Sequence, residues 1–241
     1  MDLRTALSNI HSDPLWWRKI LIGGALMFSV VGYPWAEGLV MESLDNTRKG
    51  YPTPLPPWHE WSARYLIGLF AILIDFVFFV LPAFAIGLVV FCGALTALIN
   101  AAAPYGWLAP IGIAALLLCE LAMFLAGVAP VGRLIYAEEG RAEEAMSMRT
   151  LQEALRPGAR RVYARARLRS LPAYVPALLL ALACWLVGRG TFPGALPVAA
   201  LLLWLTLSAL LYAHLAVVQI YATAERATRY DDLDAFAARR R

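Results

Sequence analysis

One stretch decides how this chain is laid out: residues 133–169, RLIYAEEGRAEEAMSMRTLQEALRPGARRVYARARLR. It contains nine arginines and five glutamates, and long apolar runs lie on both sides of it. A short loop rich in arginine between membrane segments is retained on the cytoplasmic side. The stretch therefore predicts a cytoplasmic loop within an integral membrane protein, and it sets the direction of the runs that flank it.

The composition agrees with a membrane protein. Of the 241 residues, 61% are hydrophobic and only 16% are charged, whereas soluble domains have about 25% charged residues. The net charge of +4 comes from arginines beside apolar runs, which favours anionic lipid headgroups over nucleic acid as a partner. We expect an all-α, polytopic helical membrane protein with four to six membrane segments, amphipathic surface helices and one integral membrane domain over residues 1–241.

Short amphipathic helices are predicted at two places outside the apolar runs. In residues 1–18, Leu3, Leu7 and Ile10 fall at helical spacing, which is typical of a helix lying on the membrane surface. Within the loop at 133–170 we expect two surface helices, at 148–155 and 159–169. The first of these should place Arg149 and Glu153 one turn apart on its polar side.

The number of crossings depends on two runs. Residues 20–41 contain five residues that loosen a helix, so this run crosses once or dips in and returns near Gly32. Residues 65–103 are too long for one regular crossing, so two spans turn near Pro82 or one long helix kinks there. Counting Lys and Arg on the inner side favours four crossings plus a re-entrant hairpin, and segment length favours six. Five crossings with an external N-terminus is the third layout.

All three layouts place the C-terminus on the cytoplasmic side of the membrane. They predict a cytoplasmic tail over residues 225–241 and a location in the prokaryotic inner (cytoplasmic) membrane. The side of the N-terminus differs between the layouts and stays open.

Short motifs spread along the chain carry a family resemblance. They are Asp13-Pro14-Leu15-Trp16, Gly23-Gly24, Gly50, Leu55-Pro56-Pro57-Trp58 with Trp61, Gly68, Leu81-Pro82 and Leu155-Arg156-Pro157. The chain resembles an uncharacterised family of prokaryotic integral-membrane proteins, the domain of unknown function number four thousand and thirteen. It departs from the family at Pro57, where tryptophan is expected directly after Leu-Pro. The resemblance implies a helical membrane fold and supplies no activity, so no functional residue is carried over.

Four ionisable residues lie inside apolar runs: Glu37, Asp75, Glu120 and His214. Such groups are costly in a membrane and are candidates for function. One hypothesis is a polar path in which Asp75 and Glu120 relay protons or hold a cation. The other is interhelical hydrogen bonding, worth about 0.6–2 kcal/mol per contact.

His214 is also a candidate ligand for a tetrapyrrole, such as a haem or a chlorophyll-type pigment, through a ring nitrogen. We predict no catalytic residue and no metal site, because His59-Glu60 lacks the second histidine of a zinc-protease motif at Ala63. The predicted contacts with lipid headgroups are made by five arginines of the loop, Arg160, Arg161, Arg165, Arg167 and Arg169.

Three functions are compatible with these patterns. The first is a non-enzymatic accessory or scaffold subunit that packs against other integral membrane subunits, or against itself, and against anionic lipid. The second is a small transporter or pore using Asp75, Glu120 and His214. The third is a pigment- or haem-binding accessory subunit with His214 as the ligand.

Overall fold

A computed structural model describes residues 2–99, 108–190 and 193–239 of the chain, and every regular element within these ranges is helical. The elements are α1 (Leu3–His11), α2 (Trp16–Leu26), α3 (Tyr33–Lys49), α4 (Trp61–Asp75), the π-helical η1 (Phe76–Val80), α5 (Leu81–Ile99), α6 (Leu108–Ala126), α7 (Val128–Glu139), α8 (Ala142–Ala145), α9 (Met148–Leu155), α10 (Pro157–Ser170), the 3₁₀-helical η2 (Leu171–Tyr174), α11 (Val175–Gly188) and α12 (Ala195–Arg239).

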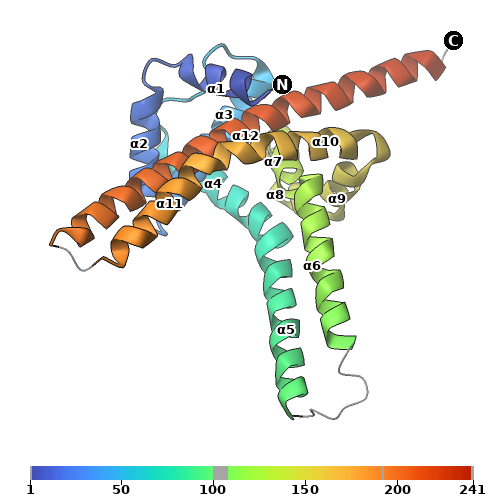
Figure 1. The fold of residues 1–241 in the computed structure, drawn as a ribbon. Helices are drawn as coiled ribbons and strands as arrows, with labels where there is room; N and C mark the ends of the chain where they lie inside the picture. Colours follow the sequence, from blue (N-terminus) through green and yellow to red (C-terminus); the bar gives the residue numbers. More distant parts are fainter. Residues whose placement is uncertain (1, 100–107, 191–192, 240–241) are drawn as a thin grey trace.

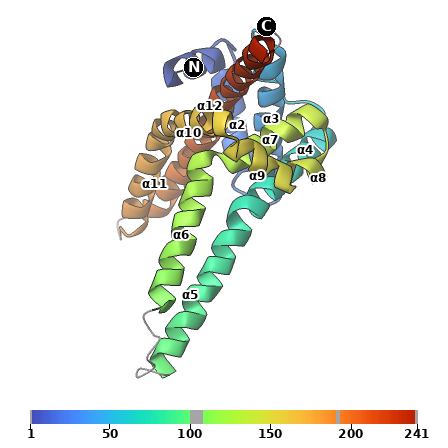
Figure 2. The ribbon, with the colours of Figure 1, turned by 90° about the vertical axis from the view of Figure 1, so that its right-hand side faces the viewer.

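Two helical hairpins leave a common body (Figure 1). One hairpin is α5 with α6, and the other is α11 with α12; they point in different directions in Figure 1, and Figure 2 shows both from a second side. The body comprises α1 to α3, α7 to α10 and the later part of α12. Helix α12 runs through its centre, since it contacts α1, α2, α3, α7 and α10.

The described residues confirm the predicted fold class of a polytopic helical membrane protein. Three of their helices are long and apolar enough to cross a membrane: Trp61–Gly93, Pro157–Gly188 and Ala195–Arg229. Pro110–Ala126 and Val128–Glu139, with a bend of 44° between them, make a fourth if the bent pair is counted as one span. The bend falls at Gly127, whose φ of 71° favours glycine because it is left-handed.

The long apolar run around Pro82 is one helix. Helices α4, η1 and α5 follow each other without a turn, and the π-helical residues Phe76–Val80 lie directly before Pro82. The proline ring clashes with the carbonyl four residues earlier and donates no hydrogen bond, so the preceding turn widens. The alternative of two short spans turning at Pro82 is therefore wrong.

Residues 20–41 do not form one regular span. Helix α2 ends at Leu26 and α3 begins at Tyr33, so the run is divided between two helices that contact each other. The turn between them exposes Phe28, Val30 and Val31. The run is therefore not a single continuous helix, and whether it dips into a membrane stays a prediction.

The predicted N-terminal helix is present, but its apolar face is covered by protein. Ala6 and Ile10 are fully buried, and Leu3 and Leu7 pack against the same core. Helix α1 contacts α12. Its apolar residues are therefore occupied by the body of the molecule and not free to face lipid.

Both helices predicted in the arginine-rich loop are present as α9 and α10, and α10 continues through η2 into α11. Arg149 and Glu153 lie one turn apart on α9, as predicted, but each pairs with a different residue. Nη1 of Arg149 lies 2.6 Å from Oε1 of Glu139, and Oε1 of Glu153 lies 3.3 Å from Nη2 of Arg156. Nor does α12 break at the predicted start of the tail, because it continues as one helix to Arg239 and its end projects from the body (Figure 1).

Candidate functional site

A cluster of charged side chains ties four elements together where the hairpins meet the body. Arg133 of α7 is buried, and its Nη1 lies 2.8 Å from Oε2 of Glu37, a fully buried residue of α3. The other edge of the same guanidinium pairs with Asp75 at the end of α4, with Nε donating to Oδ1 at 3.2 Å and Nη2 to Oδ2. One arginine therefore bridges two carboxylates through two separate edges of its guanidinium.

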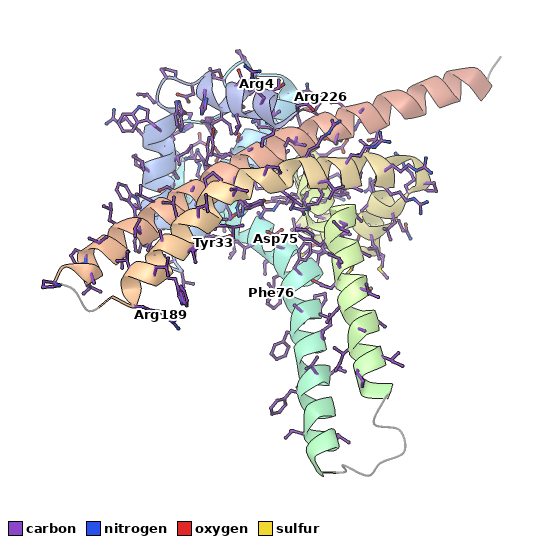
Figure 3. The ribbon with its side chains drawn as sticks, viewed as in Figure 1. Arg4, Tyr33, Asp75, Phe76, Arg189 and Arg226 are labelled. Carbon is purple, nitrogen blue, oxygen red and sulfur yellow. The ribbon has the colours of Figure 1, made fainter. Side chains whose placement is uncertain are left out.

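His214 of α12 completes this ionic cluster. Its Nδ1 lies 2.8 Å from Oε1 of Glu37, within hydrogen-bond distance. Its ring meets the ring of Tyr174 edge-on, and the Tyr33 hydroxyl also interacts with the Glu37 carboxylate. The cluster joins α3, α4, α7 and α12, which are far apart in the sequence. Figure 3 shows the labelled Tyr33 and Asp75 near this junction.

The electrostatics of Glu37 follow from these contacts. Helix α3 lies outside the candidate membrane spans. Burial alone would raise the pKa of the Glu37 carboxyl, but the Arg133 guanidinium and His214 outweigh it and hold that pKa below its ordinary value. Glu37 is therefore ionised at neutral pH and acts as an acceptor of charge-assisted bonds.

This shift predicts an acid sensitivity with a defined sign. A carboxyl whose pKa is lowered by folding contributes stability that is complete above its unfolded pKa, near about 4.3, and is lost as the pH falls. The melting temperature of the wild-type protein in detergent should therefore fall more steeply than that of Glu37→Gln from about pH 5 to about pH 3. Parallel curves for the two proteins would contradict this assignment, because Gln cannot titrate.

A cavity of about 350 Å³ lies beside the ionic cluster. Its polar lining consists of Tyr33, Asp75, Arg133, Arg167, Tyr174 and His214, and its apolar lining of Phe79, Val80, Phe124, Ala129, Pro130, Val217 and Val218. The volume falls within the range of about 300–1,000 Å³ typical of small-molecule sites. Residues from α4, η1, α6, α7, α10, η2 and α12, together with Tyr33 at the start of α3, thus form one pocket at the base of both hairpins.

The structure brings three of the four predicted ionisable residues together and leaves one apart. Glu37, Asp75 and His214 all join Arg133 or each other. Glu120 does not line the cavity and belongs to the α5/α6 hairpin. One oxygen of its carboxylate, Oε2, is buried without a hydrogen-bond partner among the described residues.

The five arginines predicted to contact lipid headgroups differ in exposure. Four are exposed on α10, namely Arg160, Arg161, Arg165 and Arg169. Arg167 is 5% exposed and lines the cavity, so its expected place on the surface is wrong. Arg167 is buried because it lies on the face of α10 that packs on α12. The other buried residues of that face include Ala159, Tyr163 and Ala166.

Sequence reasoning missed the residue at the centre of the cluster. Arg133 was counted among the cytoplasmic loop arginines, although it lies within helix α7 directly after an apolar run. Its position next to that run was the available signal, because a charge there needs a buried acidic partner.

The described residues contain no group of three side chains suited to hold a metal ion. Any ligation by His214 would have to use Nε2, since Nδ1 faces Glu37. A carboxylate partner of this kind is common behind ligating histidines, so the tetrapyrrole hypothesis stays a prediction.

Fold and site together define an all-helical protein of the multi-pass membrane class, with an ionic cluster and a pocket at the base of its hairpins. The chain belongs to the family described as "Protein of unknown function (DUF4013)", whose model matches residues 21–187. No curated protein and no solved structure matches the chain.

Proposed function

We propose that this chain is a non-enzymatic membrane subunit that packs against other membrane helices and against anionic lipid. The α5/α6 hairpin makes the contact with another chain, either a different integral membrane subunit or a second copy. The observation that carries the proposal is the half-buried Glu120 of this hairpin, whose Oε2 has no hydrogen-bond partner among the described residues.

The surface of the hairpin supports this assignment. Large apolar side chains project from both helices, including Phe84 and Phe91 of α5 and Leu118 of α6. Lipid can cover apolar side chains, but it cannot satisfy a carboxyl in the hydrocarbon region. An ionisable group there is expected to face protein, and a hydrogen bond across helices stabilises it by about 0.6–2 kcal/mol.

The same observations make transport a weaker candidate. A proton or cation path needs polar groups that face one another along one route. Asp75 and His214 line the cavity, but Glu120 does not, and Asp75 is already paired with Arg133. The groups expected to form the path are thus divided between two places.

The lipid part of the proposal rests on α10. Its four exposed arginines, Arg160, Arg161, Arg165 and Arg169, lie just before the apolar helix α11. Each such residue near an anionic membrane surface contributes about 1 kcal/mol of attraction. We therefore place the body and the C-terminus on the cytoplasmic side of a prokaryotic inner membrane.

Native cysteines allow the protein contact to be tested in intact membranes. Cys119 is exposed on α6, next to Glu120. In a Cys92→Ser, Cys184→Ser background, Cys119 is labelled with benzophenone maleimide and irradiated before solubilisation. We expect a covalent adduct with another membrane protein or a second copy, identified by mass spectrometry.

Variants at Glu120 provide the matched control. Glu120→Gln keeps hydrogen-bonding groups and should retain the adduct, whereas Glu120→Leu removes them and should reduce its yield several-fold, in line with about 1 kcal/mol of lost contact. A labelled protein that forms adducts only with lipid, in all three forms, would contradict the proposed function.

A further inference from the structure

Arg167 lies on the wall of the cavity in an environment that leaves its charge without an acidic partner. The residue is 5% exposed, and its Nε donates to the carbonyl oxygen of Phe124 at 3.1 Å. The guanidinium also stacks over the ring of Phe124 at 4.3 Å and lies 5.7 Å from the ring of Tyr221. These contacts hold the side chain in place, but none of them neutralises its charge.

The two other deeply buried arginines are both paired with carboxylates. Arg133 pairs with Glu37 and Asp75, and Arg64 pairs with Glu42. Within residues 2–99, 108–190 and 193–239, no carboxylate lies within 4.0 Å of Arg167. Burying a cation without a counter-charge is costly, so this position is prepared to receive an anion.

The rest of the cavity defines what kind of anion fits. Asp75, the carboxylate that lines the cavity among the described residues, is held by Nε and Nη2 on one edge of the Arg133 guanidinium. His214 and Tyr174 supply further polar groups. On the apolar side lie Phe79 and Val80 from the start of one hairpin and Val217 and Val218 from α12. The lining of the cavity is therefore cationic at Arg167 and apolar on the side of the hairpins.

We propose that this cavity binds a phosphate group through Arg167, with the apolar wall accommodating an attached acyl chain. Arginine presents a planar fork that matches phosphate oxygens, and basic pockets between membrane helices on the cytoplasmic side bind lipid headgroups. The phosphate is supplied by an anionic phospholipid or by the free ion. Arg167 is buried and separate from the exposed arginines of α10, so the inference goes beyond the proposed function and is tested independently of it.

The test uses the purified full chain in detergent and measures ligand binding by native mass spectrometry and by the shift in melting temperature. The probes are phosphatidylglycerol, phosphatidylcholine and inorganic phosphate. Phosphatidylglycerol should bind one molecule per chain, and Arg167→Gln should weaken this binding by at least about tenfold, as expected for a charge-assisted contact. Arg165→Gln, with the same charge change on the exposed face of α10, should weaken it less than about twofold.

A second variant covers the case in which Arg167→Gln does not fold. Val80 is exposed but lines the cavity, so Val80→Trp obstructs the site without disturbing the core and should also lose the lipid. Inorganic phosphate that binds with the same dependence on Arg167 would support the site and identify the free ion as the ligand. Absence of both phosphatidylglycerol and phosphate binding, equal binding by Arg167→Gln, or equal loss in Arg165→Gln would overturn the proposal.

Discussion

Replacing Arg133 by methionine is expected to destabilise the protein by about 3–5 kcal/mol. The substitution keeps a long side chain but leaves Glu37 fully buried without its cation and Asp75 without its bidentate partner. Removing one partner of a buried ion pair costs more than the pair contributes, because the remaining charge is left uncompensated. Thermal denaturation in detergent, followed by tryptophan fluorescence or by loss of the monodisperse peak, measures the effect.

Two further variants make this prediction specific. Arg141→Met removes an exposed arginine from the same region and should change the free energy of unfolding by less than about 0.5 kcal/mol. Adding Glu37→Gln to Arg133→Met should restore part of the lost stability, because it removes the buried charge. An Arg133→Met protein that melts within about 2 °C of Arg141→Met would show that the ionic cluster does not hold the body together.

A single methyl group on Gly68 is expected to disrupt the packing of α3 on α4. A Cβ built there would lie 1.7 Å from the carbonyl oxygen of Pro34 and 2.6 Å from the amide nitrogen of Gly38. Both neighbours are backbone atoms and cannot rotate away, so the two helices must separate. We expect Gly68→Ala to lower the free energy of unfolding by about 1–3 kcal/mol and to reduce the yield of folded protein.

Gly87 provides the matched control for this substitution. A Cβ at Gly87 of α5 meets nothing within 4 Å, and alanine is the better helix former by roughly 0.5–1 kcal/mol. Gly87→Ala should therefore be neutral or slightly stabilising in the same melting experiment. Equal melting temperatures for the two alanine variants would contradict the close crossing of α3 and α4.

Elements whose signal is local could be predicted from the sequence. The candidate membrane spans could be predicted from the apolar runs, because length and hydropathy decide whether a helix can cross a membrane. The positions of the short helices α1, α9 and α10 also followed from local patterns, although the apolar face of α1 packs on the body of the molecule. Pro82 marked the irregular turn, although the sequence did not distinguish a widened helix from a reversal of the chain.

Contacts between distant segments could not be predicted in the same way. The sequence marked Glu37, Asp75 and His214 as candidates, but Arg133, which pairs with both carboxylates, comes from a helix that begins more than fifty residues after Asp75. Nothing in the local pattern distinguishes Arg167 from Arg165 or Arg169. The packing of α10 on α12 decides which arginine is buried, and that packing depends on residues from both helices.

The cytoplasmic orientation of the body is the central part of the proposed function, and cysteine labelling in intact cells tests it most directly. In a cysteine-free background, Arg141→Cys lies in the body and Arg189→Cys lies at the end of α11. A maleimide that cannot cross membranes should label Arg189→Cys from outside, and should label Arg141→Cys only after the cells are opened. Labelling of Arg141→Cys in intact cells would contradict the cytoplasmic position of the arginine-rich body.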